Sequence, residues 1–231
     1  MGTFQEQLSL SVVIPALDAG ETIAGLVAAL AGSRLIGEIV VVDGGSRDES
    51  AALAAAAGAR VVDAPRGRGT QLAGGAAAAD GEWLLFLHAD CRLEAGWEEA
   101  VERFLAMPGA AGRAGYFTLA LDESAPAARR LERIVAWRCR FFALPYGDQG
   151  LLIARRLYEG VGGFRPLPLM EDVDLARRLG PRRLAPIGAR IVASARRYRA
   201  GGYWRRPARN LFCLGLYFLG LSPARIARLY R

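Results

Sequence analysis

Short, unbroken runs of apolar residues alternate with longer alanine-rich segments along the first 90 residues of the chain. A short continuous apolar run is typical of a strand that is buried on both faces. We predict four such strands at 10–15, 38–42, 60–63 and 83–87. The segments between them, which end near residues 30, 57 and 79, are predicted to be helices. This alternation predicts an α/β fold with a mainly parallel sheet and helices on both faces.

Charged and polar residues mark where the first two helices are expected to begin. Asp18 and Glu21 follow the first strand, where the positive end of a helix dipole favours acids. Ser46 and Glu49 have the spacing of a capping box ahead of the second helix. The less regular pattern after residue 90 predicts helices at 95–106, 127–144, 155–160 and 170–179, and a strand at 113–121. Because there is no repeat or clear linker, we expect a single domain, 1–231, that ends in a basic helical extension, 196–231.

The composition favours a folded protein in a reducing compartment. Hydrophobic residues make up 52% of the chain, which is enough for a sizeable core. No apolar run reaches the length of about 18 residues that a transmembrane helix needs, and the first residues lack the pattern of a secretory signal. Three widely spaced cysteines, Cys91, Cys139 and Cys213, match neither a disulfide framework nor a zinc site. We therefore expect a cytoplasmic protein.

The net charge of +7 is unevenly distributed, and all 30 basic residues are arginines. The absence of lysine excludes Schiff-base catalysis and the phosphate-binding G-x-x-x-x-G-K-[ST] loop. Up to Asp174, 16 arginines stand against 23 acids, whereas 14 arginines and no acid follow. Such a basic segment is suited to anions, whether phosphate, acidic lipid or nucleic acid. We expect no nucleic-acid partner, because its aromatic residues form an apolar stripe and are not interleaved with arginines as stacking platforms.

Three carboxylates are expected at one edge of the predicted sheet. Asp43 and Asp90 follow the second and fourth strands, and Asp18 lies in the loop after the first. Parallel strands place their carboxyl ends together, beside positive helix N-termini. Such a site can hold a divalent cation together with a diphosphate. Asp43 and Asp90 can equally be turn or capping residues, and His88, two positions before Asp90, can be a packed histidine.

A second pair of acids, Glu171 and Asp172, opens the helix predicted at 170–179 and follows a loop rich in glycine and proline. Acids at this position can simply complement the helix dipole. Alternatively, one of them can act as a general base at the rim of a pocket. The pattern alone leaves both interpretations open.

Taken together, these motifs resemble those of the inverting nucleotide-sugar glycosyltransferases of family two, which have the GT-A fold. The resemblance covers residues 8–180 and runs through V-V-I-P-A-L-D-A-G-E-T-I, V-V-V-D-G-G-S-R-D-E-S, F-L-H-A-D, G-V-G-G-F and M-E-D-V-D-L. The L-H-A-D form, the Y-G-D-Q-G stretch and the arginine-rich tail are most similar to the subgroup associated with arsenosugar biosynthesis or selenium.

This resemblance implies a metal-dependent, inverting transfer of a sugar from a nucleoside-diphosphate sugar to an acceptor hydroxyl. It assigns 8–120 to the nucleotide-sugar-binding half and 121–195 to the acceptor-side half. Asp172 would be the general base with Glu171 beside it, and Asp90 would bind Mg or Mn at the diphosphate. The residues implied at the nucleotide sugar are Pro15, Ala16, Leu17, Asp18, Glu21, Asp43, Arg66, Arg68, Asp90, Arg196 and Arg197. Those implied on the acceptor side are Asp148, Gln149, Gly150, Gly162 and Gly163.

One position departs from the family pattern. The metal motif of the family is usually Asp-x-Asp, and here His88 stands at its first position. A histidine can ligate Mn but supplies no negative charge. The metal ligands would therefore be Asp90 with His88, or Asp90 nearly alone with phosphate and water. The alternative is a catalytically degenerate GT-A protein that binds nucleotides or a membrane surface.

The apolar stretch 211–221 is flanked by arginines and is too short to span a bilayer. It is expected to be a core helix or an oligomer contact, or else an interfacial helix at the inner face of the cell membrane. An interfacial helix would suit a lipid-linked acceptor rather than a small-molecule one. Two other enzyme classes do not fit. Sugar-phosphate nucleotidylyltransferases have a glycine-rich loop followed by essential lysines, and this chain has no lysine. Dinucleotide-dependent oxidoreductases need G-x-G-x-x-G after the first strand, where this chain has P-A-L-D-A-G.

Overall fold

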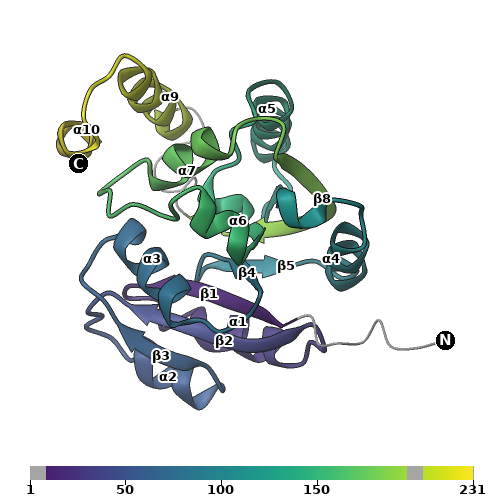
Figure 1. The fold of residues 1–231 in the computed structure, drawn as a ribbon. Helices are drawn as coiled ribbons and strands as arrows, with labels where there is room; N and C mark the ends of the chain where they lie inside the picture. Colours follow the sequence, from purple (N-terminus) through teal and green to yellow (C-terminus); the bar gives the residue numbers. More distant parts are fainter. Residues whose placement is uncertain (1–8, 197–204, 231) are drawn as a thin grey trace.

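A mixed β-sheet lies at the centre of the protein (Figure 1). The computed structural model describes residues 9–196 and 205–230. Within them the sheet has eight strands in the order β3-β2-β1-β4-β7-β6-β8-β5. The strands are β1 Leu10–Ala16, β2 Ile36–Asp43, β3 Arg60–Asp63, β4 Trp83–Phe86, β5 Cys91–Leu93, β6 Ala114–Leu121, β7 Leu151–Ala154 and β8 Leu184–Ala193.

The first four strands in the sequence, β1 to β4, pair in parallel, as the sequence predicts. Every residue of β4 is buried, because its apolar side chains face helices on both sides of the sheet. Beyond β4 the sheet is mixed: β7 runs antiparallel to β4 and to β6, β8 runs parallel to β6, and β5 runs antiparallel to β8. The sequence predicted none of the strands β5, β7 and β8. Pro186 and Gly188 interrupt the β8 pattern, and β5 has only three residues.

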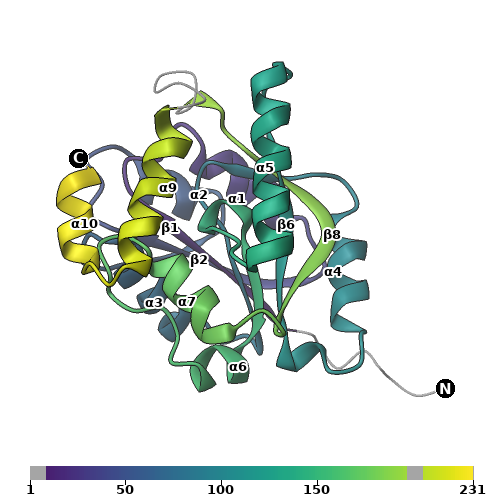
Figure 2. The same cartoon turned by 90° about the horizontal axis from the view of Figure 1, so that it is seen from above.

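Helices cover both faces of this sheet (Figure 2). On one face, α1, α2 and α4 share a hydrophobic cluster with Val12 and Ile14 of β1, whereas α3, α6 and α7 share another cluster with Val13 on the other face. Neighbouring residues of β1 thus serve opposite faces, as the pleat of a strand requires. The helices are α1 Ile23–Ala31, α2 Ser50–Ala56, α3 Arg68–Ala78, α4 Trp97–Leu105, α5 Pro126–Phe142, α6 Arg155–Gly160, α7 Glu171–Leu179, α9 Arg205–Phe218 and α10 Pro223–Tyr230, with 3-10 turns at Ala110–Gly112 and Gly147–Gln149.

The C-terminal helices α9 and α10 pack beside α7 (Figures 1 and 2). Cys213 and Leu214 of α9 and Ile226 of α10 are buried against Val173 and Ala176 of α7. The stretch 211–221 is therefore partly a core helix, as expected, although its other face is exposed. None of the described helices combines the length and the hydropathy that crossing a bilayer requires.

The predicted capping box at the start of α2 does not form. The helix begins at Ser50, with Glu49 as its cap residue and no side-chain hydrogen bond to the helix N-terminus. The Ser46 hydroxyl instead donates to Asp43. Ser46 bonds to Asp43 instead of capping the helix because the two residues lie in the same turn at the end of β2.

Candidate active site

A cleft of about 760 Å³ opens at the carboxyl ends of β1 and β4. Open α/β sheets bind ligands at this edge, where helix N-termini also converge. The loops after β1 and β4, the loop before α3 and the end of β8 form its walls. Most of the residues predicted at the nucleotide sugar line it: Pro15, Ala16, Leu17, Asp18, Glu21, Arg66, Arg68, Asp90 and Arg196. His88, predicted as a metal ligand, lines it as well.

The loop between β2 and α2 fixes the wall that carries Asp18. The Asp18 backbone N–H donates to Ser46 Oγ (3.0 Å), and Asp18 Oδ1 accepts from the Arg47 N–H (2.8 Å). The Gly20 N–H donates to Asp48 Oδ2 (2.9 Å). Asp18 has φ +49°, a left-handed conformation that costs free energy and that these bonds hold in place. The D-G-G-S-R-D-E-S motif thus holds in place the wall of the cleft that carries Asp18.

Asp43 was expected to hold a base or ribose, and in this structure its carboxylate is bonded within its own loop. Its side chain is only 6% exposed and does not line the cleft. One carboxylate oxygen accepts from the Gly45 N–H (3.0 Å) and the Ser46 N–H (2.9 Å), and the other accepts from the Ser46 hydroxyl. Asp43 therefore stabilises the loop that supports the cleft wall, which is the turn-residue alternative.

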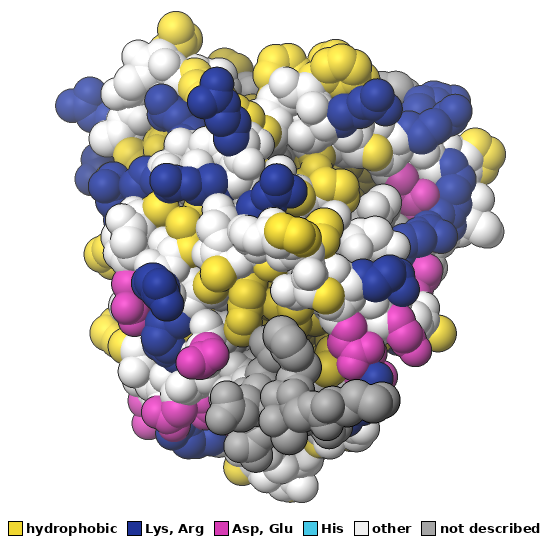
Figure 3. Space-filling model, turned by 45° about the vertical axis from the view of Figure 1, so that its right-hand side comes forward, with side chains coloured by type: hydrophobic (Ala, Val, Ile, Leu, Met, Phe, Trp, Pro, Cys, Tyr) yellow, Lys and Arg dark blue, Asp and Glu magenta, His cyan; other side chains and the backbone are white. Residues whose placement is uncertain are grey.

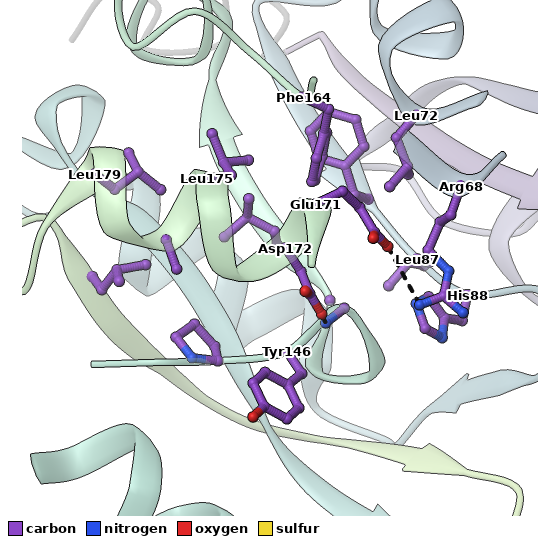
Figure 4. Close-up of a pocket in the computed structure, with 17 residues that line it drawn as sticks. Arg68, Leu72, Leu87, His88, Tyr146, Phe164, Glu171, Asp172, Leu175 and Leu179 are labelled. Carbon is purple, nitrogen blue, oxygen red and sulfur yellow. Dashed lines mark hydrogen bonds and ion pairs between the residues drawn. The ribbon is translucent and has the colours of Figure 1, made fainter. Parts of the chain in front are cut away.

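The N-terminus of α3 brings Arg68 to the centre of the site. A Cβ added at Gly69 would lie 2.2 Å from the Arg165 carbonyl oxygen and 3.0 Å from the Leu167 nitrogen, so only glycine allows this approach of backbone to backbone. The Arg68 guanidinium then lies 3.4 Å from the Glu171 carboxylate at the start of α7. Figure 4 shows these two side chains pointing toward each other.

A second cavity of about 340 Å³ adjoins the first and shares Arg68, His88 and Asp90 with it. Its remaining walls come from the loop before β7, the start of α7, the end of β8 and Asn210 of α9, and they include Tyr146, Gly147, Asp148, Glu171 and Asp172. The structure thus brings the acceptor-side residue Asp148 and both α7 acids to the residues at the end of β4.

Gly147, in the loop before β7, connects this loop to the end of β4 and to α7. Its N–H donates to Asp172 Oδ2 (2.8 Å), and a Cβ at this position would lie 2.7 Å from His88 Nε2. A side chain here would therefore displace the imidazole. Asp172 Oδ1 accepts from the Val173 N–H (2.7 Å), and this partly exposed residue lines the second cavity but not the first.

Several titratable groups in this region have perturbed pKa values. Burial, followed by the negative charge of Asp172, raises the pKa of Glu171 to about 7, and the Arg68 guanidinium offsets only part of this rise. Burial also raises the pKa of Asp148, against the opposing effect of Arg138. Burial lowers the pKa of Arg68, but the surrounding carboxylates, led by Glu171, outweigh it and give a net rise. Perturbed acids in a cleft are typical of functional sites.

A comparison with known protein families identifies the family to which the chain belongs. The profile of glycosyl transferase family 2 matches residues 11–156. The chain belongs to glycosyl transferase family 2. It is therefore a glycosyltransferase, and the predicted GT-A architecture is confirmed.

Solved structures of glycosyltransferases share this fold. A glucosyl-3-phosphoglycerate synthase from Mycobacterium tuberculosis, crystallised with Mn²⁺, uridine diphosphate and glucosyl-3-phosphoglycerate, matches with a TM-score of 0.59 and 22% identity over 80% of this chain and 70% of that one. The same synthase with Mn²⁺, UDP-glucose and phosphoglyceric acid matches with a TM-score of 0.56 and 23% identity over 77% and 68%. A mycobacterial protein matches with a TM-score of 0.55 and 25% identity over 80% and 65%. No curated protein sequence matches the chain.

The donor set at the end of β4 fits a weakly held divalent cation. Among the described residues no group of three histidine, cysteine or acidic side chains is placed to hold a metal ion. Asp90 and His88 nevertheless line both cavities. Mg²⁺ is commonly bound through one or two carboxylates together with substrate phosphates and water. A site with Asp90 as its carboxylate suits this family member, provided that the diphosphate completes the coordination.

Some predicted site residues lie elsewhere. Gln149 is 1% exposed and donates to the Phe117 carbonyl (3.1 Å), so it supports the acceptor loop from the core. Gly162 and Gly163 do not line either cavity; the Gly163 carbonyl accepts from Arg178 (2.6 Å). Gly150 lines an inner extension of the second cavity. Arg197 lies outside the described residues.

The cleft also contains residues that the sequence did not single out. Gln71 of α3 lines it and donates to the Ala16 carbonyl (2.8 Å) and the Val42 carbonyl (2.9 Å), which ties the ends of β1 and β2 together. Asp48 and Ser194 line it as well. Asp48 belongs to the recognised D-G-G-S-R-D-E-S motif and was visible there, whereas no local pattern marks Gln71 or Ser194.

Proposed function

We propose that this protein is a metal-dependent, inverting glycosyltransferase that moves a sugar from a nucleoside-diphosphate sugar to an acceptor hydroxyl. The observation that carries the proposal is the junction of two cavities at Arg68, His88 and Asp90. The larger cavity is big enough for a nucleotide sugar, and the smaller one is lined by the two acids of α7. A donor and an acceptor bound in adjoining cavities would meet at this junction.

The donor would lie in the larger cavity. Arg66, Arg68 and Arg196 line it and carry the positive charge that a diphosphate needs. Asp90, with His88 beside it, would hold Mg²⁺ or Mn²⁺ against the diphosphate, as the metal and UDP in the crystallised synthases suggest by analogy. Arg197 is likewise proposed to bind the diphosphate. The bound cation would supply positive charge to the leaving nucleoside diphosphate.

Asp172 is the better candidate for the general base. Glu171 is 3% exposed and is paired with Arg68 on the donor side, so an acceptor hydroxyl has little access to it. Asp172 is partly exposed, and the Gly147 N–H holds it in the smaller cavity. Asp172 would accept the proton of the acceptor hydroxyl as its oxygen attacks the anomeric carbon from the face opposite the diphosphate. The configuration at the anomeric carbon would therefore be inverted.

Stabilisation of the leaving group would provide most of the rate enhancement. Arginines fixed beside a developing diphosphate charge require no reorganisation during the reaction. A general base contributes on the order of a hundred- to ten-thousand-fold. The halves 8–120 and 121–195 would then serve donor and acceptor respectively. The assignment to the subgroup associated with arsenosugar biosynthesis or selenium stays a prediction, because the family match does not reach that level.

The test is thermal unfolding against a panel of nucleoside diphosphates, with Mn²⁺ and with EDTA. A ligand at about 100 times its Kd stabilises the folded state by about 2.7 kcal/mol. For a chain of this size that corresponds to a Tm rise of about 5–10 °C. We expect such a rise with one nucleotide, lost with EDTA and in Asp90→Asn. No rise with any nucleotide would favour the degenerate, non-catalytic alternative.

A further inference from the structure

An apolar groove of about 330 Å³ runs between α5 and α9. Leu131 and Ile134 of α5 and Ala208 and Leu211 of α9 line its walls. The groove adjoins the proposed acceptor cavity, since Tyr146, Asp148 and Asn210 line both spaces. The two spaces therefore meet at these three residues, close to the acids at the start of α7.

The inner end of this groove is polar. The Arg138 guanidinium lies 3.4 Å from the centre of the Tyr146 ring and donates to the Leu144 carbonyl (2.9 Å), which fixes it beside Asp148. One carboxylate oxygen of Asp148 is buried and has no hydrogen-bond partner among the described residues. A ligand that fills both spaces would be amphiphilic, with its polar group near Asp148 and Asp172 and its apolar part between the helices.

The outer end of the groove opens onto an exposed apolar face. Of the ten large apolar side chains that are exposed in the described residues, eight lie on α5, on α9 or directly after α9. Ile134, Trp137 and Phe141, at helical spacing, form one stripe on α5 that begins in the groove, and they are 50%, 54% and 63% exposed. On α9, Leu211 and Phe212 are 68% and 62% exposed. Exposed clusters of this kind mark interaction surfaces.

The charge around this apolar face is positive. α5 carries five arginines and a single acid, Glu132, and no acid occurs in α9 or α10. Figure 3 shows hydrophobic and arginine side chains interleaved over the upper part of the molecule, the end at which Figure 1 places α5 and α9, whereas most acidic side chains lie lower. Aromatic and aliphatic side chains flanked by arginines are suited to an anionic bilayer surface.

We propose that the α5–α9 groove binds the hydrocarbon chain of an anionic lipid acceptor, which the enzyme takes from a membrane surface on which the exposed stripe docks. The proposal rests on the proposed function, since it names the acceptor of the same site. The lipid headgroup would lie beside Arg138 and Asp148, within reach of Asp172. The chain would leave between Ile134 and Leu211.

Vesicle flotation tests the docking surface. The protein should float with phosphatidylglycerol vesicles at low salt and bind phosphatidylcholine vesicles at least tenfold less. It should dissociate in 0.5 M salt, because the Debye length there is shorter than about 10 Å and the exposed charges are screened. The double variant Trp137→Ser/Phe141→Ser should lose binding at least tenfold. Met107→Ser, which removes another exposed apolar side chain outside this face, should bind as the wild type does. Equal binding to both kinds of vesicle would overturn the proposal.

Titration with dihexanoyl phosphatidic acid, a short-chain anionic lipid that stays monomeric, tests the groove. Saturable binding is expected, with at least a tenfold loss in Ile134→Glu and, from the opposite wall, in Leu211→Glu. Both side chains are at least half exposed, so folding should be retained, and unchanged Tm values verify this. Met107→Glu is the matched control.

Two outcomes separate this proposal from the proposed function. A Tm rise with nucleotide but no binding of either lipid probe overturns the lipid acceptor and leaves the glycosyltransferase site intact. Lipid binding without any nucleotide-dependent rise overturns the proposed site and supports a membrane-binding role of the groove. A concentration-dependent dimer that shields Trp137 from an aqueous quencher would show that the face binds a second copy of the chain, and would overturn the docking surface.

Discussion

Replacing Glu171 with glutamine should flatten the pH dependence of folding stability. Burial and the nearby charge of Asp172 raise the pKa of the Glu171 carboxyl from 4.5 to about 7. Between these two pH values the folded protein binds more protons at this group than the unfolded chain does. The free energy of unfolding therefore falls as the pH rises through this window. The stabilisation is complete at low pH, where both states are protonated at this group, and is lost by about pH 7 to 8.

The size of the effect follows from the same rise. Each pKa unit corresponds to about 1.4 kcal/mol, so a rise from 4.5 to about 7 corresponds to a loss on the order of 3 kcal/mol between acidic and neutral pH. The side chain is 3% exposed, so solvent screens this contribution little. Glutamine has nearly the same shape and stays neutral. Glu171→Gln should exceed the wild type by less than about 1 kcal/mol at pH 5 and by up to about 3 kcal/mol at pH 8, where the difference corresponds to about 6–12 °C in Tm.

The assay is thermal unfolding followed by circular dichroism between pH 5 and 8.5 without nucleotide. Each Tm difference is taken between variant and wild type at the same pH, so that other titrating groups cancel. Glu159→Gln removes an exposed carboxylate on α6 and should give a curve parallel to that of the wild type. Parallel curves for Glu171→Gln as well would refute the assignment of a buried, largely protonated Glu171. A variant that is less stable at pH 8 would show instead that the Arg68 ion pair dominates.

Two further substitutions test the site and its support. Asp172→Asn should lower turnover a hundred- to ten-thousand-fold while the nucleotide-dependent Tm rise stays, with the exposed Asp80→Asn as control; near-normal turnover would remove Asp172 as the base. Gly69→Ala should cost about 1–3 kcal/mol and weaken nucleotide binding, because its Cβ would overlap the Arg165 carbonyl. Gly74→Ala in the same helix meets no atom nearer than 3.8 Å and should be neutral or stabilising by up to about 1 kcal/mol, so equal losses in both variants would contradict this explanation.

The sequence predicted the parallel half of the sheet well because its strands are buried on both faces. Continuous apolar runs mark β1 and β4 without help from distant residues. β8 could not be found in this way, since Pro186, Gly188 and Arg190 break its pattern and only pairing with β6 and β5 makes it a strand. Its hydrogen-bond partners are more than 60 residues away in the chain, and local patterns carry no information about them.

The sequence predicted which residues of the candidate site lie at the carboxyl edge of the sheet. It did not predict which of their side chains are occupied by hydrogen bonds to neighbouring residues. The Asp18 loop and the end of β4 follow from the edge rule for parallel strands. Asp43 obeys the same rule, yet its oxygens are occupied by Gly45 and Ser46, and only the path of the loop decides that. Gln149 lies in the acceptor motif but points into the core. A position next to a site is therefore easier to predict than a contact with it.

The proposed acceptor side depends on one topological feature that no local pattern reveals. β7 runs antiparallel to β4, with Phe86 opposite Leu151 and Trp83 opposite Ala154. The edge at which β4 ends is thus the edge at which β7 begins, so the loop that leads into β7 lies beside the loop that leaves β4. This pairing brings Gly147 against His88 and, through its N–H, fixes Asp172 of α7 across the junction. Had β7 been parallel to β4, the acids of α7 would have had no loop to hold them opposite Asp90.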